Sequence, residues 1–321
     1  MNILISGGSG FLGSAFSKEI ISRYENKKEQ IKITWLTRDK SQQHPADVNM
    51  MTYDELATSD KSFDVIINLA GAGIADSRWS DERKEQLMAS RVKPTESLLE
   101  FIARSRVKPK LMLSGSAIGW YGTQGDTPLT ERSDYETDFS HKLCDEWEKL
   151  ALKATDYGVP VAIVRTGVVM HPEGGMIGKL LLPFKFGVGG QLADGKQIMS
   201  WISREDWVGA AIFIIQKHLA ETSEKQVTPN NELKTTNDTP AVVYNLTAPN
   251  PVTNHKFTKA MGAWLHRPTI FTLPEFLLKL MFGEMSTLLI DGQKVLPEAL
   301  LEAGYEFKYT DIQQALEEQS T

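Results

Sequence analysis

The chain begins MNILISGGSGFLG (residues 1–13), and this stretch decides the fold class. Residues 2–6 form a short apolar run of the strand type, and a helical pattern follows the evenly spaced glycines Gly7, Gly10 and Gly13. Glycines let the backbone turn tightly and approach a pyrophosphate, while the N-terminus of a helix offers free N–H groups and a partial positive charge. The stretch therefore predicts a dinucleotide-binding turn. The alternative is an ordinary glycine-rich turn, which the position between the first strand and the first helix disfavours.

Short apolar runs alternate with amphipathic helical stretches along the first half of the chain. Strands are predicted at residues 2–6, 31–36, 65–68, 110–114, 161–165 and 242–246, and helices at 11–23, 80–104 and 138–156. Repeated strand–helix–strand order is the signature of a parallel sheet with helices on both faces. The predicted fold class is α/β, a Rossmann-like doubly wound parallel sheet with a smaller, mostly helical C-terminal lobe.

The composition of the segments predicts how the chain is divided. We expect residues 1–170 to form a nucleotide-binding Rossmann domain, completed by a returning strand near 241–247. Residues 171–204, rich in glycine and proline at their start, and residues 248–321 are expected to form the C-terminal lobe on the substrate side. Residues 222–239 are polar with almost no apolar side chains, which predicts a flexible surface loop.

Charge and cysteine content exclude several classes of partner. The 321 residues carry a formal net charge of −6, so neither a nucleic acid nor an anionic membrane surface is expected as a partner. The single cysteine, Cys144, cannot form an intrachain disulfide. No apolar run approaches the roughly 20 residues of a membrane helix, and no signal peptide begins the chain. We expect a soluble cytoplasmic protein with a small-molecule substrate and no metal; its oligomeric state is left open, with a homodimer as one option.

The end of the second predicted strand indicates which dinucleotide is bound. Folds that bind NAD usually place Asp or Glu there to hold the adenosine ribose hydroxyls. This chain has Thr37 in that place, followed by Arg38. A guanidinium pairs bidentately with phosphate, so the sequence predicts NADP(H) as the cofactor. The alternative is that Arg38 is a solvated charge and Asp39 is the ribose ligand.

Four longer stretches carry a family resemblance. They are NLAGAGIADSRWSDERKEQLMASRVKPTESLLE (68–100), SGSAIGWYG (114–122), VRTGVVMHPEGGMIGKLLLPFKFGVGGQLADGKQIMSWISREDWV (164–208) and LLIDGQKVLPEALLEAGYEFKYTDIQQAL (288–316). With the G-x-x-G-x-x-G spacing, they resemble extended short-chain dehydrogenases/reductases of the NAD-dependent epimerase/dehydratase family. The resemblance is greatest to its atypical, epimerase-like branch with a C-terminal domain of unknown function, and it covers almost the whole chain.

The resemblance implies twelve cofactor-binding positions. Those expected at the pyrophosphate are Gly7, Gly10, Phe11, Leu12 and Gly13; those at the 2′-phosphate are Thr37 and Arg38; those along the rest of the cofactor are Leu69, Ala70, Glu85, Arg91 and Val169. Val169 is expected near the nicotinamide. For Glu85 and Arg91 the alternative is a pair of exposed helix charges.

The catalytic residues of ordinary family members are only partly present. Those members use Tyr as acid/base, Lys to lower the pKa of that Tyr, and Ser to polarise the substrate carbonyl. Ser116 aligns with the Ser, whereas Glu148, which follows the Lys by four positions in the ordinary pattern, puts Cys144 at the Lys site and Ser140 at the Tyr site. The missing pair puts standard epimerase chemistry in doubt.

The remaining candidates are few. Ser116 and Tyr121 are the predicted catalytic residues; Tyr121 either faces the nicotinamide or packs beside Trp120. His141 and Lys142 are expected in surface roles. The leading hypothesis is an NADP(H)-binding oxidoreductase or epimerase-like protein with an unknown small polar substrate. Whether it is an enzyme is left open, because a non-catalytic NADP(H) sensor or regulatory protein, or a partner-binding scaffold, would share these residues.

Overall fold

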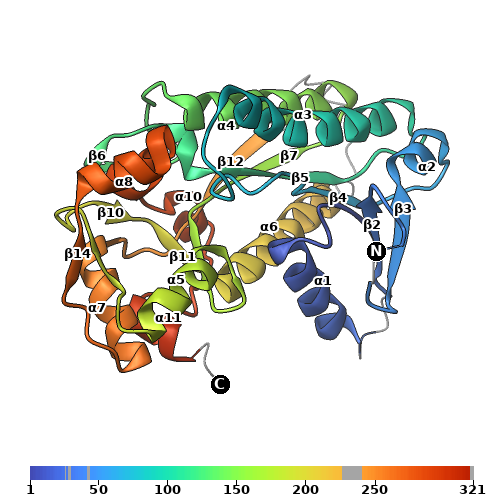
Figure 1. The fold of residues 1–321 in the computed structure, drawn as a ribbon. Helices are drawn as coiled ribbons and strands as arrows, with labels where there is room; N and C mark the ends of the chain where they lie inside the picture. Colours follow the sequence, from blue (N-terminus) through green and yellow to red (C-terminus); the bar gives the residue numbers. More distant parts are fainter. Residues whose placement is uncertain (26, 28–29, 42–43, 226–240, 319–321) are drawn as a thin grey trace.

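The centre of the molecule is a parallel sheet of seven strands with helices on both faces (Figure 1). The computed structural model describes residues 1–25, 27, 30–41, 44–225 and 241–318. The strand order is β12-β7-β5-β4-β1-β2-β3. The bounds are β1 (Asn2–Ser6), β2 (Lys32–Thr37), β3 (Val48–Thr52), β4 (Val65–Asn68), β5 (Leu111–Ala117), β7 (Val161–Thr166) and β12 (Ala241–Leu246). This arrangement confirms the predicted fold class.

The strand order locates the crevice in which an open α/β sheet binds its ligands. The chain proceeds outward from β1 through β2 to β3 and then returns to β4 on the other side of β1. Ligands of such sheets lie at the carboxyl ends of the strands, where the order reverses. The carboxyl ends of β1 and β4 therefore border the candidate site.

All six predicted strands are present in the sheet, but the sequence did not predict β3. This edge strand has five residues, VNMMT, and only Val48 and Met51 are buried. An edge strand is covered on fewer sides than a central one, so its apolar pattern is short and broken. Of the predicted polar loop at 222–239, residues 222–225 belong to α6 (Arg204–Lys225), and 226–239 lie outside the described residues.

Two apolar layers join the sheet to its helices. Ile3, Ile5 and Ile67 belong to the layer shared with α1 (Phe11–Tyr24) and α6. Leu4, Ile66 and Met112 belong to the opposite layer, shared with α2 (Tyr53–Thr58), α3 (Asp81–Arg104) and α4 (Phe139–Leu152). Because alternate residues of each strand point to opposite faces, the continuous apolar runs predicted for these strands serve both layers.

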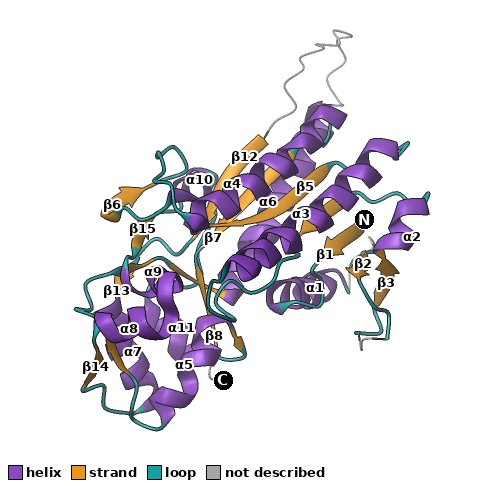
Figure 2. Ribbon diagram, turned by 45° about the horizontal axis from the view of Figure 1, so that its top comes forward, coloured by secondary structure: helices purple, strands orange, loops and turns teal. Residues whose placement is uncertain are grey.

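A smaller group of helices and short strands lies beyond the carboxyl ends of the sheet (Figure 2). Its elements, with the short helical turns η1 and η3, are η1 (Ile118–Tyr121), β6 (Gly125–Leu129), β8 (Val168–His171), α5 (Gly175–Lys185), β9 (Gly190–Leu192), β10 (Ile198–Met199), β11 (Trp201–Ser203), β13 (Val252–Thr253), α7 (Asn254–Leu265), β14 (Phe271–Leu273), α8 (Glu275–Phe282), η3 (Gly283–Ser286), α9 (Thr287–Ile290), β15 (Gln293–Val295), α10 (Glu298–Glu302) and α11 (Ile312–Glu318). A third short turn, η2 (Lys153–Tyr157), directly follows α4 and packs into the layer of α2, α3 and α4, before the start of β7.

The smaller group has its own core around Trp201, Phe257 and Tyr309. The C-terminal segment also reaches the main sheet, because Leu300 of α10 packs into the layer of α1 and α6. The division of the chain at the expected domain boundaries stays a prediction. Within the described part of the chain, no helix combines the length and apolarity needed to cross a bilayer.

Candidate functional site

The glycine-rich turn lies where β1 meets α1, against the backbone at the end of β4. Gly7 has φ +82°, and a Cβ there would lie 2.7 Å from the carbonyl carbon of Leu69 and 2.8 Å from the nitrogen of Ala70. A Cβ at Gly13 would lie 2.4 Å from the carbonyl oxygen of Gly7. Gly10 is the N-cap of α1 and supplies no side-chain cap for the first amides of the helix. The turn therefore leaves these N–H groups available to an anion.

Phe11 connects this turn to the segment after β8. Phe11 and Leu12 open α1 and are half-buried. A Cβ at Gly174 would lie 2.7 Å from the Phe11 ring, and one at Gly175 would lie 2.9 Å from the carbonyl oxygen of Val169. Two predicted cofactor residues, Phe11 and Val169, thus border the same pair of glycines, although they are distant in sequence.

After the end of β2, an arginine side chain is exposed to solvent and the next acid is hydrogen-bonded within its own turn. The Asp39 carboxylate accepts hydrogen bonds from the Ser41 hydroxyl (2.6 Å) and the Ser41 N–H group (2.8 Å), which lower the pKa of Asp39. The buried Thr37 hydroxyl donates to the carbonyl oxygen of Asp39 at 2.7 Å. Arg38 lies between them and is exposed. The carboxylate is therefore engaged within its own turn, while the guanidinium is available.

Arg91 is half-buried and supports the loop that follows β4, whereas Glu85 is exposed on α3. Arg91 donates to the carbonyl oxygens of Leu87 (3.0 Å) and Ala72 (3.2 Å), and its guanidinium lies 5.3 Å from the Trp147 ring. Burial lowers the pKa of Arg91. Of the two interpretations of this pair, exposed helix charges describe Glu85 but not Arg91.

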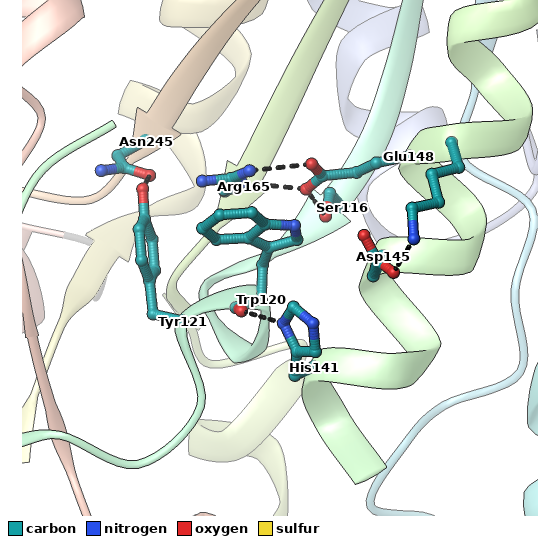
Figure 3. A network of polar contacts seen from close by, with 9 residues as sticks. Ser116, Trp120, Tyr121, His141, Asp145, Glu148, Arg165 and Asn245 are labelled. Atoms are coloured by element: carbon teal, nitrogen blue, oxygen red, sulfur yellow. Dashed lines mark hydrogen bonds and ion pairs between the residues drawn. The ribbon is translucent and has the colours of Figure 1, made fainter. Parts of the chain in front are cut away.

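Ser116 belongs to a buried polar network between β5, α4 and β7 (Figure 3). Its hydroxyl donates to Glu148 Oε1 at 2.5 Å. Arg165 binds the same carboxylate bidentately, Nε to Oε1 and Nη2 to Oε2, both at 2.9 Å. The guanidinium carbon lies 3.4 Å from the centroid of the Trp120 ring. Ion pairing with Glu148 raises the pKa of Arg165, although its burial acts in the opposite direction. The proton of Ser116 is thus directed at Glu148.

Tyr121 is fully buried next to this network. Its hydroxyl donates to Asn245 Oδ1 at 2.8 Å, and its ring meets Trp120 edge to face at 5.2 Å. Burial raises the pKa of Tyr121. Of the two interpretations from the sequence, this arrangement supports packing beside Trp120 over a side chain that faces the nicotinamide.

The expectation of a surface role was wrong for His141. His141 is 4% exposed, its Nδ1 lies 2.6 Å from the carbonyl oxygen of Trp120, and its ring stacks on Tyr135 at 3.9 Å. Because Nδ1 faces a carbonyl oxygen, Nδ1 carries the hydrogen and donates it. The reason is tertiary: η1 and the loop of Tyr135 cover the first turn of α4, which periodicity within the helix cannot show. Lys142, one residue further round the helix, is exposed as expected.

Sequence reasoning missed Arg165 and used Glu148 only to align the helix. A signal was available. Arg165 is the fifth residue of the run VAIVRT (161–166), whose first four residues are apolar and buried. A charged residue is almost never fully buried unless it is paired. An arginine in such a strand therefore indicates a buried acidic partner, although the sequence alone does not identify it.

Comparisons with known proteins identify the family of the chain. The model of the NAD dependent epimerase/dehydratase family matches residues 3–228, and that of a domain of unknown function (DUF1731) matches residues 273–319. An epimerase family protein of Staphylococcus epidermidis is 32% identical over 321 residues, which is 98% of this chain and 97% of that protein. The chain belongs to the NAD-dependent epimerase/dehydratase family. The resemblance in the sequence is confirmed, including its C-terminal domain.

Solved structures extend the comparison to three-dimensional folds. The human epimerase family protein SDR39U1, solved with NADPH, is 28% identical and has a TM-score of 0.82. The match covers 100% of this chain and 99% of that one. A nucleoside-diphosphate sugar epimerase of Corynebacterium glutamicum is 27% identical with a TM-score of 0.67, over 98% of this chain and 57% of that one. The UDP-glucose 4-epimerase of Thermotoga maritima, at 16% identity and a TM-score of 0.72, shows the fold alone.

Ser140 and Cys144, which the sequence pattern puts at the Tyr and Lys sites, lie together on α4. Both are buried, and a Cβ at Gly119 would lie 3.0 Å from Cβ of Ser140 and 3.7 Å from Sγ of Cys144. Burial raises the pKa of Cys144 to about 11, so the thiol stays protonated near neutral pH. Within the described residues, no group of three or more His, Cys, Asp or Glu side chains is arranged to hold a metal ion.

Proposed function

We propose that the protein binds NADP(H) and is an oxidoreductase or epimerase-like enzyme for a small polar substrate. The observation that carries the proposal is the end of β2, where Arg38 is exposed and the Asp39 carboxylate is bonded to Ser41. An acid that faced the adenosine ribose would repel a 2′-phosphate, whereas a guanidinium pairs with it. The human relative solved with NADPH supports the same cofactor.

The residues of the site suit a dinucleotide along its whole length. Its pyrophosphate would lie on the uncapped N-terminus of α1, against the glycine turn, with Arg38 at the 2′-phosphate and Val169 toward the nicotinamide. Leu69 and Ala70 would line it where Gly7 passes their backbone. When bound, the cofactor supplies hydride transfer at C4 of its nicotinamide.

We assign Ser116 to the substrate side of the reaction because it aligns with the serine of the family pattern; its hydroxyl would turn from Glu148 to the substrate carbonyl. Ser140 and Cys144 stand where the ordinary family pattern has Tyr and Lys, and we infer that the chain lacks this catalytic pair. A neutral thiol with a pKa of about 11 and a serine hydroxyl are both poor bases near neutral pH. Tyr121 is engaged with Asn245 and is left out of this assignment.

The presence of Ser140 and Cys144 at the Tyr and Lys positions favours a second candidate function, a non-catalytic NADP(H) sensor. A protein that keeps the cofactor-binding turn but has no base at the Tyr and Lys positions can bind the dinucleotide without turnover. The enzyme and the sensor would both bind NADP(H), and only the enzyme would convert a substrate.

The cofactor assignment is tested by fluorescence titration of the purified protein with NADPH and NADH. We expect wild type to prefer NADPH by about tenfold or more, and Arg38→Ala to remove most of that preference, because one charge-assisted phosphate contact is lost. Arg106→Ala is the matched control, since Arg106 is also exposed but lies after α3. Equal affinities of wild type for NADPH and NADH would contradict the assignment.

Turnover separates the enzyme from the sensor. The saturated NADPH complex is incubated with panels of carbonyl compounds and nucleotide sugars, and NADPH absorbance is followed. An enzyme consumes NADPH or converts a sugar, and Ser116→Ala lowers that rate while leaving NADPH affinity unchanged. Stoichiometric binding without consumption across both panels would favour the sensor.

A further inference from the structure

A polar hollow lies at the amino ends of β1, β2 and β3, at the opposite edge of the sheet from the glycine turn. Its volume is about 330 Å³. The polar residues that line it are Asn2, Lys32, Thr34, Asn49, Lys61 and Ser62. Phe63, which is buried, supplies an apolar wall. None of these residues belongs to the cofactor site described above.

Strand register brings four of the lining residues onto one face. Lys32 and Thr34 are two apart on β2, so their side chains point to the same side of the sheet. Asn2 of β1 pairs with Lys32, and Asn49 of β3 pairs with Thr34. This is the face of Leu4 and Leu36, which is covered by α2 and α3 further along the strands.

The face is left open here because α2 is short. Figure 2 shows α2 at the same edge of the sheet as β2 and β3. Its six residues rise about 9 Å, whereas the six-residue β2 is about 20 Å long. Residues 59–64 return toward the start of β4 without helical structure, and Lys61, Ser62 and Phe63 border the hollow from that side.

The lining has two cations and no carboxylate. Lys32 and Lys61 are both exposed. Of the acids that are close in sequence, Asp64 is bonded to the Asn2 N–H group and to a lysine before β5, Glu55 is bonded to the lysine at position 40, and Asp60, next to Lys61, is exposed. Lys61 contributes to lowering the pKa of Glu55, but that carboxylate lies outside the lining. The residues that line the hollow therefore carry a net positive charge.

The Thr34 side chain offers a hydrogen-bond donor to a ligand in the hollow. Thr34 is 5% exposed and lines the hollow. Among the residues that the structure describes, its hydroxyl has no hydrogen-bond partner, and it is open to solvent in the hollow. A ligand in the hollow that accepts hydrogen bonds would satisfy this hydroxyl.

We propose that the hollow binds the phosphate group of a small molecule, with the phosphate between Lys32 and Lys61 and one oxygen accepting from Thr34. Lysine binds phosphate as a point charge, and the phosphate oxygens accept several hydrogen bonds. The hollow has room for more than the phosphate, and Phe63 offers a surface for an organic part. The site is separate from the cofactor, so it does not depend on NADP(H) binding.

The test is calorimetric titration of the protein with inorganic phosphate and with phenyl phosphate. We expect saturable binding to wild type, about tenfold weaker binding to Lys32→Ala/Lys61→Ala, and about threefold to tenfold weaker binding to Thr34→Val, which removes only the hydroxyl. Lys93→Ala/Lys142→Ala makes the same change in net charge on the exposed faces of α3 and α4 and should bind like wild type. The tighter of the two probes tells whether the ligand is a monoester or the free ion.

Three results would overturn the proposal. One is the absence of saturable binding by either probe. Another is binding that is lost in Arg38→Ala and kept in Lys32→Ala/Lys61→Ala, which would place the phosphate in the cofactor site. The third is an equal loss in Lys93→Ala/Lys142→Ala, which would show a general effect of net charge. Thermal unfolding of each variant confirms that it is folded.

Discussion

At the residue scale, Arg165 explains how this sheet tolerates a charge in its interior. Its guanidinium and the Glu148 carboxylate have side-chain exposures of 4% and 7% and are joined by two hydrogen bonds. The Trp120 ring covers one face of the guanidinium. Removing one member of such a pair leaves an uncompensated buried charge, whereas removing both leaves an apolar gap.

This asymmetry predicts a double-mutant result. We expect Arg165→Met to lower the free energy of unfolding by about 3–5 kcal/mol, and Arg165→Met/Glu148→Leu to recover much of that loss. Ser116→Ala, which removes only one donor from the carboxylate, should cost about 1–3 kcal/mol. Urea unfolding followed by circular dichroism measures all three. A double variant that is less stable than both single variants together would contradict this account of the pair.

At the element scale, the β1–α1 turn owes its shape to the close approach of β4. Gly7 needs a positive φ, and it also passes the backbone of Leu69 and Ala70 at a distance that no side chain permits. Gly158, at the C-terminal end of η2, has a similar φ of +76°, but a Cβ there would meet no atom within 4 Å. A side chain at Gly158 would therefore meet backbone strain alone, whereas one at Gly7 would meet both backbone strain and steric overlap.

We predict different outcomes for alanine at these two glycines. Gly158→Ala should cost about 1–3 kcal/mol of unfolding free energy through its left-handed backbone alone. Gly7→Ala should cost more and should also weaken NADPH binding by about tenfold or more, because the turn must move away from β4. Thermal unfolding and NADPH titration of both variants provide the comparison. Equal stability losses with unchanged NADPH affinity would show that the close approach has no role.

At the scale of the whole molecule, Asp206 fastens the C-terminal segment to the start of α6. Its carboxylate accepts hydrogen bonds from the Lys308 N–H group (2.7 Å), the Tyr309 N–H group (3.0 Å) and the Ser203 hydroxyl (2.9 Å). Asp206 is 1% exposed and lies between α6 and the segment that leads to α11. Burial raises the pKa of Asp206 despite these donors.

The direction of this pKa shift gives a pH prediction. A carboxyl whose pKa is higher in the folded than in the unfolded chain takes up its proton first in the folded state as the pH falls. Wild type should therefore gain stability relative to Asp206→Asn between neutral pH and about pH 4. Urea unfolding of both proteins across this range measures the difference. If Asp206→Asn instead gained unfolding free energy relative to wild type as the pH falls, the pKa of Asp206 would not be raised.

The predictable part of this protein rests on local patterns. Apolar runs, helical periodicity and the glycines from Gly7 to Gly13 predicted the central sheet and its first turn, because strand, turn and helix preferences act over a few residues. The edge strand β3 was missed because only Val48 and Met51 of its five residues are buried, which leaves a short and broken apolar pattern. Arg38 followed from its place at the end of β2.

What the sequence by itself determined is the class of the fold, the order of its main elements and the family. The tertiary structure alone decided which side chains meet. It buried His141 under η1, joined Glu148 to Arg165, directed Ser116 at that carboxylate, and left the amino ends of three strands open beside Thr34. The physical reason is that these contacts join residues from separate elements. Their distances are set by how helices pack on the sheet, which no local pattern encodes.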